Sequence, residues 1–97
     1  MDSRFSGSPR QPSRAGFIPK VTLYKAEGCH LCERAQGQLA ALRGELEFDY
    51  DEVDIGGDPD LEARYREWLP VIEIDGARAF VYWLDEAAFR RKVSQTS

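Results

Sequence analysis

The sequence predicts an α/β fold in which a parallel β-α-β unit is followed by a β-hairpin and a last helix. Three observations lead to this prediction. An apolar run at 21–25 leads through Gly28 into a segment whose apolar residues repeat at helical spacing. An Asp-Pro pair at 58–59 marks the start of a second helix, and Asp75-Gly76 marks a tight hairpin turn. The resulting order, β-α-β-α-β-β-α, predicts a four-stranded mixed sheet flanked by helices.

The first predicted strand is 21–25, and its nearly continuous apolar residues are typical of a central strand covered on both faces. The helix that follows is expected over 30–43. Its apolar stripe repeats at intervals of three or four residues and consists of Leu31, Ala35, Leu39 and Leu42. Gly44 is expected to end the helix, because glycine accepts the left-handed conformation found after many helix ends.

The segment 45–55 is expected to form a half-buried strand, since apolar and acidic residues alternate from Leu46 to Tyr50. The alternation slips at Asp51-Glu52, and either a β-bulge or a strand end fits that slip. A row of acidic residues also raises the question of a metal site. We interpret the row as a charged edge strand, because charge along a sheet edge discourages pairing with other chains.

Turn and capping residues divide the second half of the chain. Asp58 and Pro59 suit the N-cap and first position of a short helix that runs to about Glu67, with Leu61 and Tyr65 facing inward. That helix is expected to stop before Pro70, since proline disfavours helical geometry in the residue that precedes it.

Two strands, at 71–74 and 78–82, are expected to be joined by the Asp75-Gly76 turn. Asp85 then suits the N-cap of the last helix. Leu84 and Phe89 flank this cap at the spacing of a hydrophobic staple.

Length and charge limit what kind of protein this is. At 97 residues the chain is one small domain, which we place at 20–94, after a disordered basic tail at 1–19 and before a short C-terminal tail at 95–97. Residues 1–20 sum to +3 and the remainder to −7, so an acidic body argues against nucleic acid as the main partner. The sequence has no apolar run long enough to span a bilayer and no recognisable signal peptide. We therefore expect a cytoplasmic protein without a membrane partner.

Cys29 and Cys32 form a Cys-x-x-Cys pair at the start of the first predicted helix. In a reducing cytosol, such a pair is more often catalytic or metal-binding than a structural disulfide. A thiol at a helix start faces unpaired backbone N–H groups and the positive end of the helix dipole, and both favour the thiolate. We therefore expect Cys29 to be the more exposed and reactive sulfur. Cys32 lies one turn later, close enough to pair with it, and should be shielded.

The element order, the Cys-x-x-Cys pair at the first strand–helix junction and Leu69-Pro70-Val71 before the third strand resemble the thioredoxin superfamily. The short form looks like glutaredoxin, and Gly28-Cys29-His30-Leu31-Cys32 is similar to a group of small bacterial glutaredoxin-like proteins. The resemblance implies that Cys29 is the nucleophile and Cys32 the resolving cysteine. It also implies a cis peptide bond before Pro70, with the backbone of Leu69 pairing with an extended substrate.

The chain departs from the glutaredoxin pattern at three places. Many glutaredoxins carry a basic residue three positions before the nucleophile, where this chain has Ala26, with Lys25 one position earlier. His30 stands where proline often follows the nucleophile. The Gly-Gly turn of glutathione-binding members is replaced by Tyr82-Trp83, although Asp85 can match their acidic residue. The resemblance therefore implies the fold more strongly than a glutathione partner.

These observations predict a dithiol glutaredoxin-like disulfide oxidoreductase with Cys29 and Cys32 as catalytic residues. The residues expected to bind substrate are Leu69, Pro70, His30 and Lys25. The substrate is a protein or small molecule with a disulfide, and a second thiol restores the dithiol. Glutathione is one candidate for that reductant. We expect a monomer with no tightly bound cofactor and no metal.

Two alternatives stay open from the sequence alone. One is a non-catalytic binding module or an iron–sulfur or metal carrier of the same fold. The other concerns the aromatic residues near Pro70 and at 82–83, which suit either a peptide-binding surface or ordinary packing. His30 likewise suits either a cation that favours the neighbouring thiolate or an exposed side chain with no task.

Overall fold

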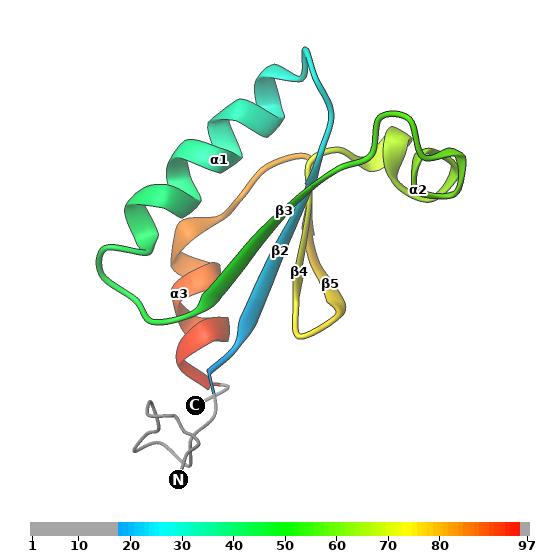
Figure 1. The fold of residues 1–97 in the computed structure, drawn as a ribbon. Helices are drawn as coiled ribbons and strands as arrows, with labels where there is room; N and C mark the ends of the chain where they lie inside the picture. Colours follow the sequence, from blue (N-terminus) through cyan, green and yellow to red (C-terminus); the bar gives the residue numbers. More distant parts are fainter. Residues whose placement is uncertain (1–17, 96–97) are drawn as a thin grey trace, which may run out of the picture.

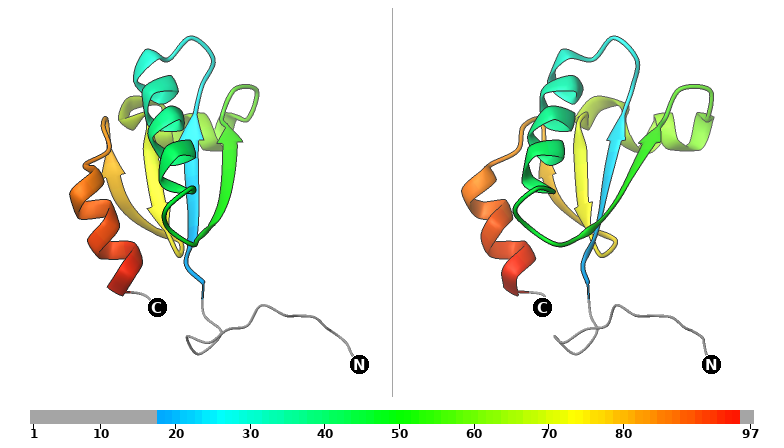
Figure 2. Two further views of the ribbon diagram at one scale, coloured as in Figure 1. Left: turned by 90° about the vertical axis from the view of Figure 1, so that its left-hand side faces the viewer. Right: turned by 60° about the vertical axis from the view of Figure 1, so that its left-hand side comes forward.

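The computed structural model describes residues 18–95, which form a four-stranded sheet with helices on both faces (Figure 1). Helices α1 (His30–Leu42) and α3 (Glu86–Gln95) cover one face. Helix α2 (Pro59–Tyr65) and the short 3-10 turn η1 (Arg66–Trp68) lie on the other side, near one end of the strands. The two further views in Figure 2 show the same layers. The predicted element order and the thioredoxin-like α/β class are confirmed.

The sheet has the strand order β3-β2-β4-β5. Strand β2 (Lys20–Lys25) runs parallel to β3 (Asp49–Asp54) and antiparallel to β4 (Val71–Ile74), which pairs in turn with β5 (Ala77–Val81). The apolar β2 is therefore central and the acidic β3 is an edge strand, as the sequence predicted.

The core is divided by the sheet into two clusters. The larger one lies under α1 and α3 and includes Leu23, Leu39, Ile72 and Phe89, each with no exposed surface. The smaller one lies under α2 and consists of Ile55, Tyr65 and Val71, with Leu69 packed against it. Burial of these side chains is the main term that stabilises the fold.

Two predictions about α1 were wrong. Leu31 is 47% exposed, and Cys32 takes its place on the buried stripe, because a helical period of 3.6 lets either residue precede Ala35. Gly44 does not adopt a left-handed conformation. Instead, the N–H of Gly44 donates to the carbonyl oxygen of Ala41, and the N–H of Leu46 donates to the carbonyl oxygen of Leu42. The chain therefore continues in helical turns after the helix ends.

This winding explains why β3 begins at Asp49 and not at the predicted residue 45. The slip in alternation at Asp51-Glu52 is neither a bulge nor a strand end, since the register with β2 runs unbroken to Asp54. The two faces of β3 are buried at different points along it. Phe48 packs in the cluster under α1 and α3, whereas Ile55 packs in the cluster under α2.

The remaining turns and caps follow the prediction. Asp58 accepts hydrogen bonds from the backbone N–H groups of Asp60 and Leu61, and Asp85 accepts one from Ala88. Asp75 and Gly76 both have positive φ, as the tight hairpin turn requires. Leu84 and Phe89 are both buried in the larger cluster, in agreement with the predicted staple.

The described residues, 18–95, extend slightly beyond the predicted domain of 20–94 at both ends. Pro19 is buried, and its carbonyl oxygen accepts the N–H of Asp49, so the packed chain includes this last residue of the predicted tail. Residues 1–17 of that tail lie outside the described residues. Helix α3 extends to Gln95, one residue beyond the predicted domain end. Within residues 18–95, no helix has the length and apolar character needed to cross a membrane.

Candidate redox site

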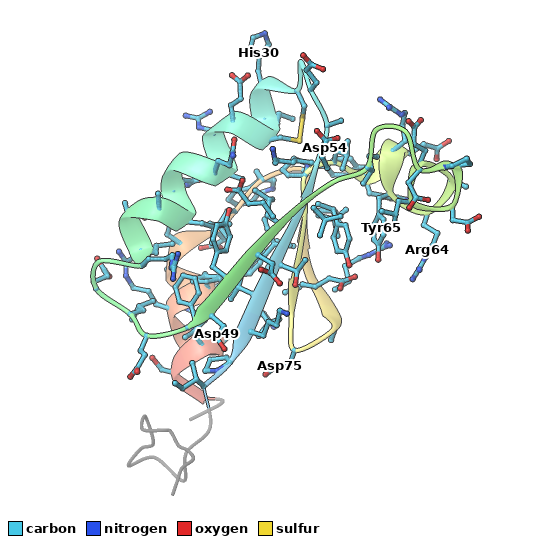
Figure 3. The ribbon with its side chains drawn as sticks, in the orientation of Figure 1. His30, Asp49, Asp54, Arg64, Tyr65 and Asp75 are labelled. Atoms are coloured by element: carbon cyan, nitrogen blue, oxygen red, sulfur yellow. A yellow bond between two sulfur atoms is a disulfide. The ribbon has the colours of Figure 1, made fainter. Side chains whose placement is uncertain are left out.

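The two cysteines form a disulfide at the N-terminal end of α1 (Figure 3). Cys29 is the N-cap residue, with extended backbone angles of φ −95° and ψ 104°. Its Sγ accepts a hydrogen bond from the N–H of Cys32 at 3.1 Å. The Cα atoms of the pair are 5.2 Å apart, within the range usual for disulfides. A sulfur atom thus takes the place that a serine or aspartate oxygen holds at most helix starts.

The surroundings of the two sulfur-bearing residues differ. Cys32 is only 1% exposed, whereas Cys29 is half-buried and therefore open to solvent on one side. Gly28, with φ +78°, provides the bend between β2 and the helix, a conformation that L-residues with a side chain rarely adopt. The predicted asymmetry between an accessible and a shielded cysteine is confirmed. The more exposed of the two is therefore the residue that caps the helix.

Leu69 and Pro70 lie at the same end of the sheet as this bend. The pairing of Tyr24 with Val71 places Pro70 next to the last residue of β2. The peptide bond between Leu69 and Pro70 is cis, as the resemblance to the thioredoxin superfamily implied. Leu69 itself is extended, with φ −63° and ψ 144°. Its backbone is therefore in the conformation that strand-like pairing with another segment requires.

The segment after β5 completes this end of the sheet. The N–H of Tyr82 donates to the carbonyl oxygen of Pro70 at 3.0 Å, and the N–H of Trp83 donates back to Val81 at 2.8 Å. The second bond spans two residues and closes a γ-turn centred on Tyr82, whose φ is +72°. A γ-turn with this sign of φ is the rarer and more strained form. Sequence reasoning missed this turn, because Tyr82 is neither glycine nor asparagine.

The γ-turn exposes large aromatic side chains beside the site. Trp83 is 64% exposed, and Tyr82 and Trp68 are also on the surface. The rings of Trp68 and Tyr82 lie 6.0 Å apart. Of the aromatic residues near Pro70 and at 82–83, Tyr65 alone is buried. The peptide-surface interpretation therefore fits three of these residues, and ordinary packing fits Tyr65.

Two other predicted site residues lie near carboxylates. Figure 3 shows His30 pointing outward from the helix end; its side chain is 95% exposed, and its Nδ1 lies 3.7 Å from Glu33 Oε1. Lys25 Nζ lies 3.9 Å from Glu52 Oε1. The same Glu52 carboxylate accepts hydrogen bonds from Gln36 and Tyr50, so a polar network ties α1 to the sheet below the disulfide. Burial and the hydrogen bond to Glu52 raise the pKa of Tyr50.

A second polar group lies on the α2 face of the sheet. The rings of Tyr24 and Tyr65 are stacked with centroids 4.1 Å apart, and both hydroxyls donate to the carboxylate of Glu73. Burial, followed by these hydrogen bonds, raises the pKa of Tyr65 to about 12. Among residues 18–95, no group of three or more His, Cys, Asp or Glu side chains is arranged to hold a metal ion.

Comparison with known proteins agrees with this geometry. The model of the glutaredoxin-like domain (DUF836) family matches residues 20–94. The chain belongs to this family. Uncharacterized protein Rv0508 of Mycobacterium tuberculosis and its counterpart Mb0520 of Mycobacterium bovis are each 36% identical over 85 residues, covering 81% of this chain and 87% of the relative.

Solved structures share the fold of this DUF836 domain. Protein Ne2328 from Nitrosomonas europaea has a TM-score of 0.70 and 25% identity, and the match covers 89% of this chain and 99% of that one. Thioredoxin from Fasciola hepatica matches with a TM-score of 0.58 and 21% identity over 82% of each chain. These likenesses show the thioredoxin-like fold, and the family model supports the predicted glutaredoxin-like assignment. The family, the fold and the Cys29–Cys32 pair together suggest a redox-type role.

Proposed function

We propose that this protein is a thiol–disulfide oxidoreductase that cycles Cys29 and Cys32 between dithiol and disulfide. The observation that supports this most directly is the asymmetry of the pair. Cys29 caps a helix with its sulfur and is half-buried, and Cys32 is buried one turn behind it. A structural disulfide has no need of an accessible sulfur beside an extended backbone segment.

The reaction consists of two exchange steps. The Cys29 thiolate attacks one sulfur of a substrate disulfide, forms a mixed disulfide and releases the other substrate sulfur as a thiolate, which takes up a proton. The Cys32 thiolate then attacks Cys29 Sγ, and the second substrate thiol leaves. Two electrons pass to the substrate, and the Cys29–Cys32 disulfide remains. Two equivalents of an external thiol reverse these steps and restore the dithiol.

The helix start lowers the energy of the attacking thiolate. The Cys32 N–H that donates to Cys29 Sγ at 3.1 Å would also stabilise a negative charge on that sulfur. Cysteines in such positions have pKa values of roughly 3.5–7.5, compared with about 8.5 for a free cysteine. Cys32 is buried and gains its reactivity only when the mixed disulfide brings an electrophilic sulfur next to it.

The substrate is proposed to lie along Leu69 and Pro70, whose extended backbone faces the same end of the sheet. Lys25 and His30 are proposed to contact it from the other side. The external thiol is a second proposal, and glutathione is one candidate for it. Tyr82 and Trp83, which stand in place of the glycines of glutathione-binding relatives, would narrow a glutathione site. We further propose that the protein acts as a cytoplasmic monomer.

The two cysteine variants test the mechanism separately. Reduced protein is mixed with bis(2-hydroxyethyl) disulfide, and the products are followed by mass. Wild type should yield the internal disulfide, Cys32→Ser should stop at a mixed disulfide on Cys29, and Cys29→Ser should not react. Full turnover by Cys29→Ser would rule out the assigned nucleophile. Metal content and visible absorbance of the anaerobically purified protein test the carrier alternative in parallel.

A further inference from the structure

Arg78 is held against two aromatic rings next to the proposed substrate path. Its guanidinium carbon lies 5.9 Å from the centroid of Tyr65 and 5.7 Å from that of Trp68. Arg78 is exposed, and among residues 18–95 no carboxylate lies within salt-bridge distance of it. Arg66 and Arg90 differ from it, since each has a carboxylate oxygen within 3.2 Å. Cation–aromatic contacts thus fix the position of this guanidinium without neutralising its charge.

The acidic residue opposite Arg78 on the neighbouring strand already accepts two hydrogen bonds. Glu73 is the register partner of Arg78 on β4, but its two carboxylate oxygens accept hydrogen bonds from the hydroxyls of Tyr24 and Tyr65. Among residues 18–95, no hydrogen bond or ion pair engages the guanidinium of Arg78, so its N–H donors are open to a group outside the described chain. A planar guanidinium binds a carboxylate through two parallel hydrogen bonds.

Arg78 is connected to the redox site by exposed aromatic side chains. The ring of Trp68 lies between Arg78 and Tyr82, and Trp68 directly precedes Leu69. The N–H of Tyr82 is bound to Pro70, and a strained γ-turn presents its side chain. Exposing these rings and holding Tyr82 at positive φ both cost free energy, which ordinary packing does not explain. We call Arg78, Trp68 and Tyr82 the aromatic–arginine surface.

Building on the proposed function, we propose that the aromatic–arginine surface binds an acidic segment of a disulfide-containing protein substrate. A carboxylate of the segment pairs with Arg78, and its neighbouring side chains pack on Trp68 and Tyr82. Residues 21–97 carry a net charge of −7, which repels an acidic segment from most of the domain, whereas Arg78 and the neighbouring Arg64, whose guanidinium carbon lies 5.2 Å from the Tyr65 centroid, attract one here. Such a combination of local attraction and general repulsion favours one binding register.

The spacing across the aromatic–arginine surface sets where the acidic residue must lie. The side chains of Arg78 and Tyr82 both contact the Trp68 ring, at 5.7 Å and 6.0 Å, so they lie within about 12 Å of each other. The proposal places the reacting cysteine of the substrate at Tyr82, and at roughly 3.3 Å per residue the carboxylate then falls roughly three to five residues from it in an extended chain. A polypeptide spans this distance, whereas a small-molecule disulfide such as cystine does not.

The test compares two peptides that each contain one disulfide and differ only in the residues three to five positions from the cysteine, glutamate in one and glutamine in the other. The rate of mixed-disulfide formation with Cys32→Ser protein is measured by mass. We expect the glutamate peptide to react about fivefold faster, as for one solvent-exposed ion pair with good geometry. This preference should decrease at high salt.

Three variants in the Cys32→Ser background assign the preference to the surface. Arg78→Gln should abolish it, and Arg78→Lys should keep only part of it, because an ammonium group lacks the planar pair of donors. Arg91→Gln is the matched control: Arg91 is exposed on α3, and its replacement removes the same charge. The control should keep the full preference.

The outcomes separate this inference from the proposed function. Equal rates for the two peptides, or a preference that survives Arg78→Gln, would overturn the acidic-segment assignment while leaving the oxidoreductase intact. A preference lost equally in Arg91→Gln would show an effect of net charge and would also overturn it. If neither peptide nor bis(2-hydroxyethyl) disulfide reacts with Cys29, the proposed function itself fails.

Discussion

Tyr82 provides a sharp test of the strained turn beside the redox site. Its φ of +72° is a conformation that costs an L-residue about 1–2 kcal/mol and costs glycine almost nothing. Tyr82→Ala and Tyr82→Gly both remove the ring contact with Trp68, so that loss cancels when the two variants are compared. Only the glycine variant also relieves the backbone strain.

The expected difference follows from two opposing effects. Relief of strain favours Tyr82→Gly, and the larger entropy of unfolded glycine opposes it by roughly 0.5–1 kcal/mol. Taken at the midpoints of these two ranges, Tyr82→Gly is more stable than Tyr82→Ala by about 0.75 kcal/mol, or ~3–6 °C in Tm for a domain of this size. Thermal unfolding followed by circular dichroism measures it.

In the control, glycine is expected to be less stable than alanine, the opposite of the result expected at position 82. Ala63 is exposed on α2, where Ala63→Gly should lower stability by about 1 kcal/mol, the usual helix penalty. If Tyr82→Ala proves as stable as Tyr82→Gly or more so, while Ala63→Gly behaves as expected, Tyr82 is not strained and the γ-turn argument is wrong.

Three further predictions concern the scaffold. Phe89→Ala should lower the free energy of unfolding by about 3–5 kcal/mol in urea titrations, because Phe89 is fully buried with its ring 5.3 Å from that of Phe48; a loss under 1 kcal/mol would contradict the core assignment. Asp85→Ala should cost about 1 kcal/mol by removing the acceptor for the Ala88 N–H, and Asp85→Asn should restore most of it. Tyr65 has its pKa raised to about 12 by burial, against about 10 when unfolded, so its contribution to stability is full below pH 10 and is lost as the pH rises toward 12. Tyr65→Phe should flatten that alkaline loss of stability, and an unchanged slope would assign it to other groups.

Much of the fold could be predicted because local signals and tertiary structure agree. Asp58 with Pro59, Asp75 with Gly76, and Asp85 each satisfy backbone groups within a few residues, and such short-range effects are readable from the chain alone. The cis bond before Pro70 was predicted by resemblance, not from local physics, since trans is the usual form of such bonds.

The predicted start of β3 and the predicted buried stripe of α1 were wrong because more than one pattern of burial fits the sequence there. The strand beginning at 45 was assigned from a single alternation, but β3 is covered by α1 and α3 at one end and by α2 at the other. Leu31 was assigned to the buried stripe because its spacing to Ala35 is as good as that of Cys32. Spacing cannot choose between them, whereas the disulfide places Cys32 inside and leaves Leu31 on the surface.

The candidate site was predicted less completely than the fold, because its contacts join residues far apart in sequence. Cys29 and Cys32 were identifiable from their spacing, but the contact of Arg78 with Trp68 and the turn at Tyr82 depend on how β5 meets η1. No local pattern encodes these contacts. From the sequence alone, Trp68 near Pro70 and Tyr82 after the last strand suit either packing or peptide binding.

The free-energy cost of strained backbone is concentrated at Tyr82, next to Pro70. This supports a substrate-binding role for the end of the sheet that carries Pro70 and Cys29. Elsewhere in residues 18–95, a non-glycine residue with positive φ is found only at Asp75, where a hairpin needs it and where aspartate tolerates it. Tyr82 is not in a hairpin turn and is not a residue type that tolerates positive φ. Its turn is nevertheless fixed by backbone hydrogen bonds from Tyr82 to Pro70 and from Trp83 to Val81. Packing offsets only part of this cost, because Tyr82 contacts Trp68 but is 44% exposed, and Trp83 is 64% exposed. A bound partner that covers these rings would recover the cost, and the accessible Cys29 lies at the same end of the sheet.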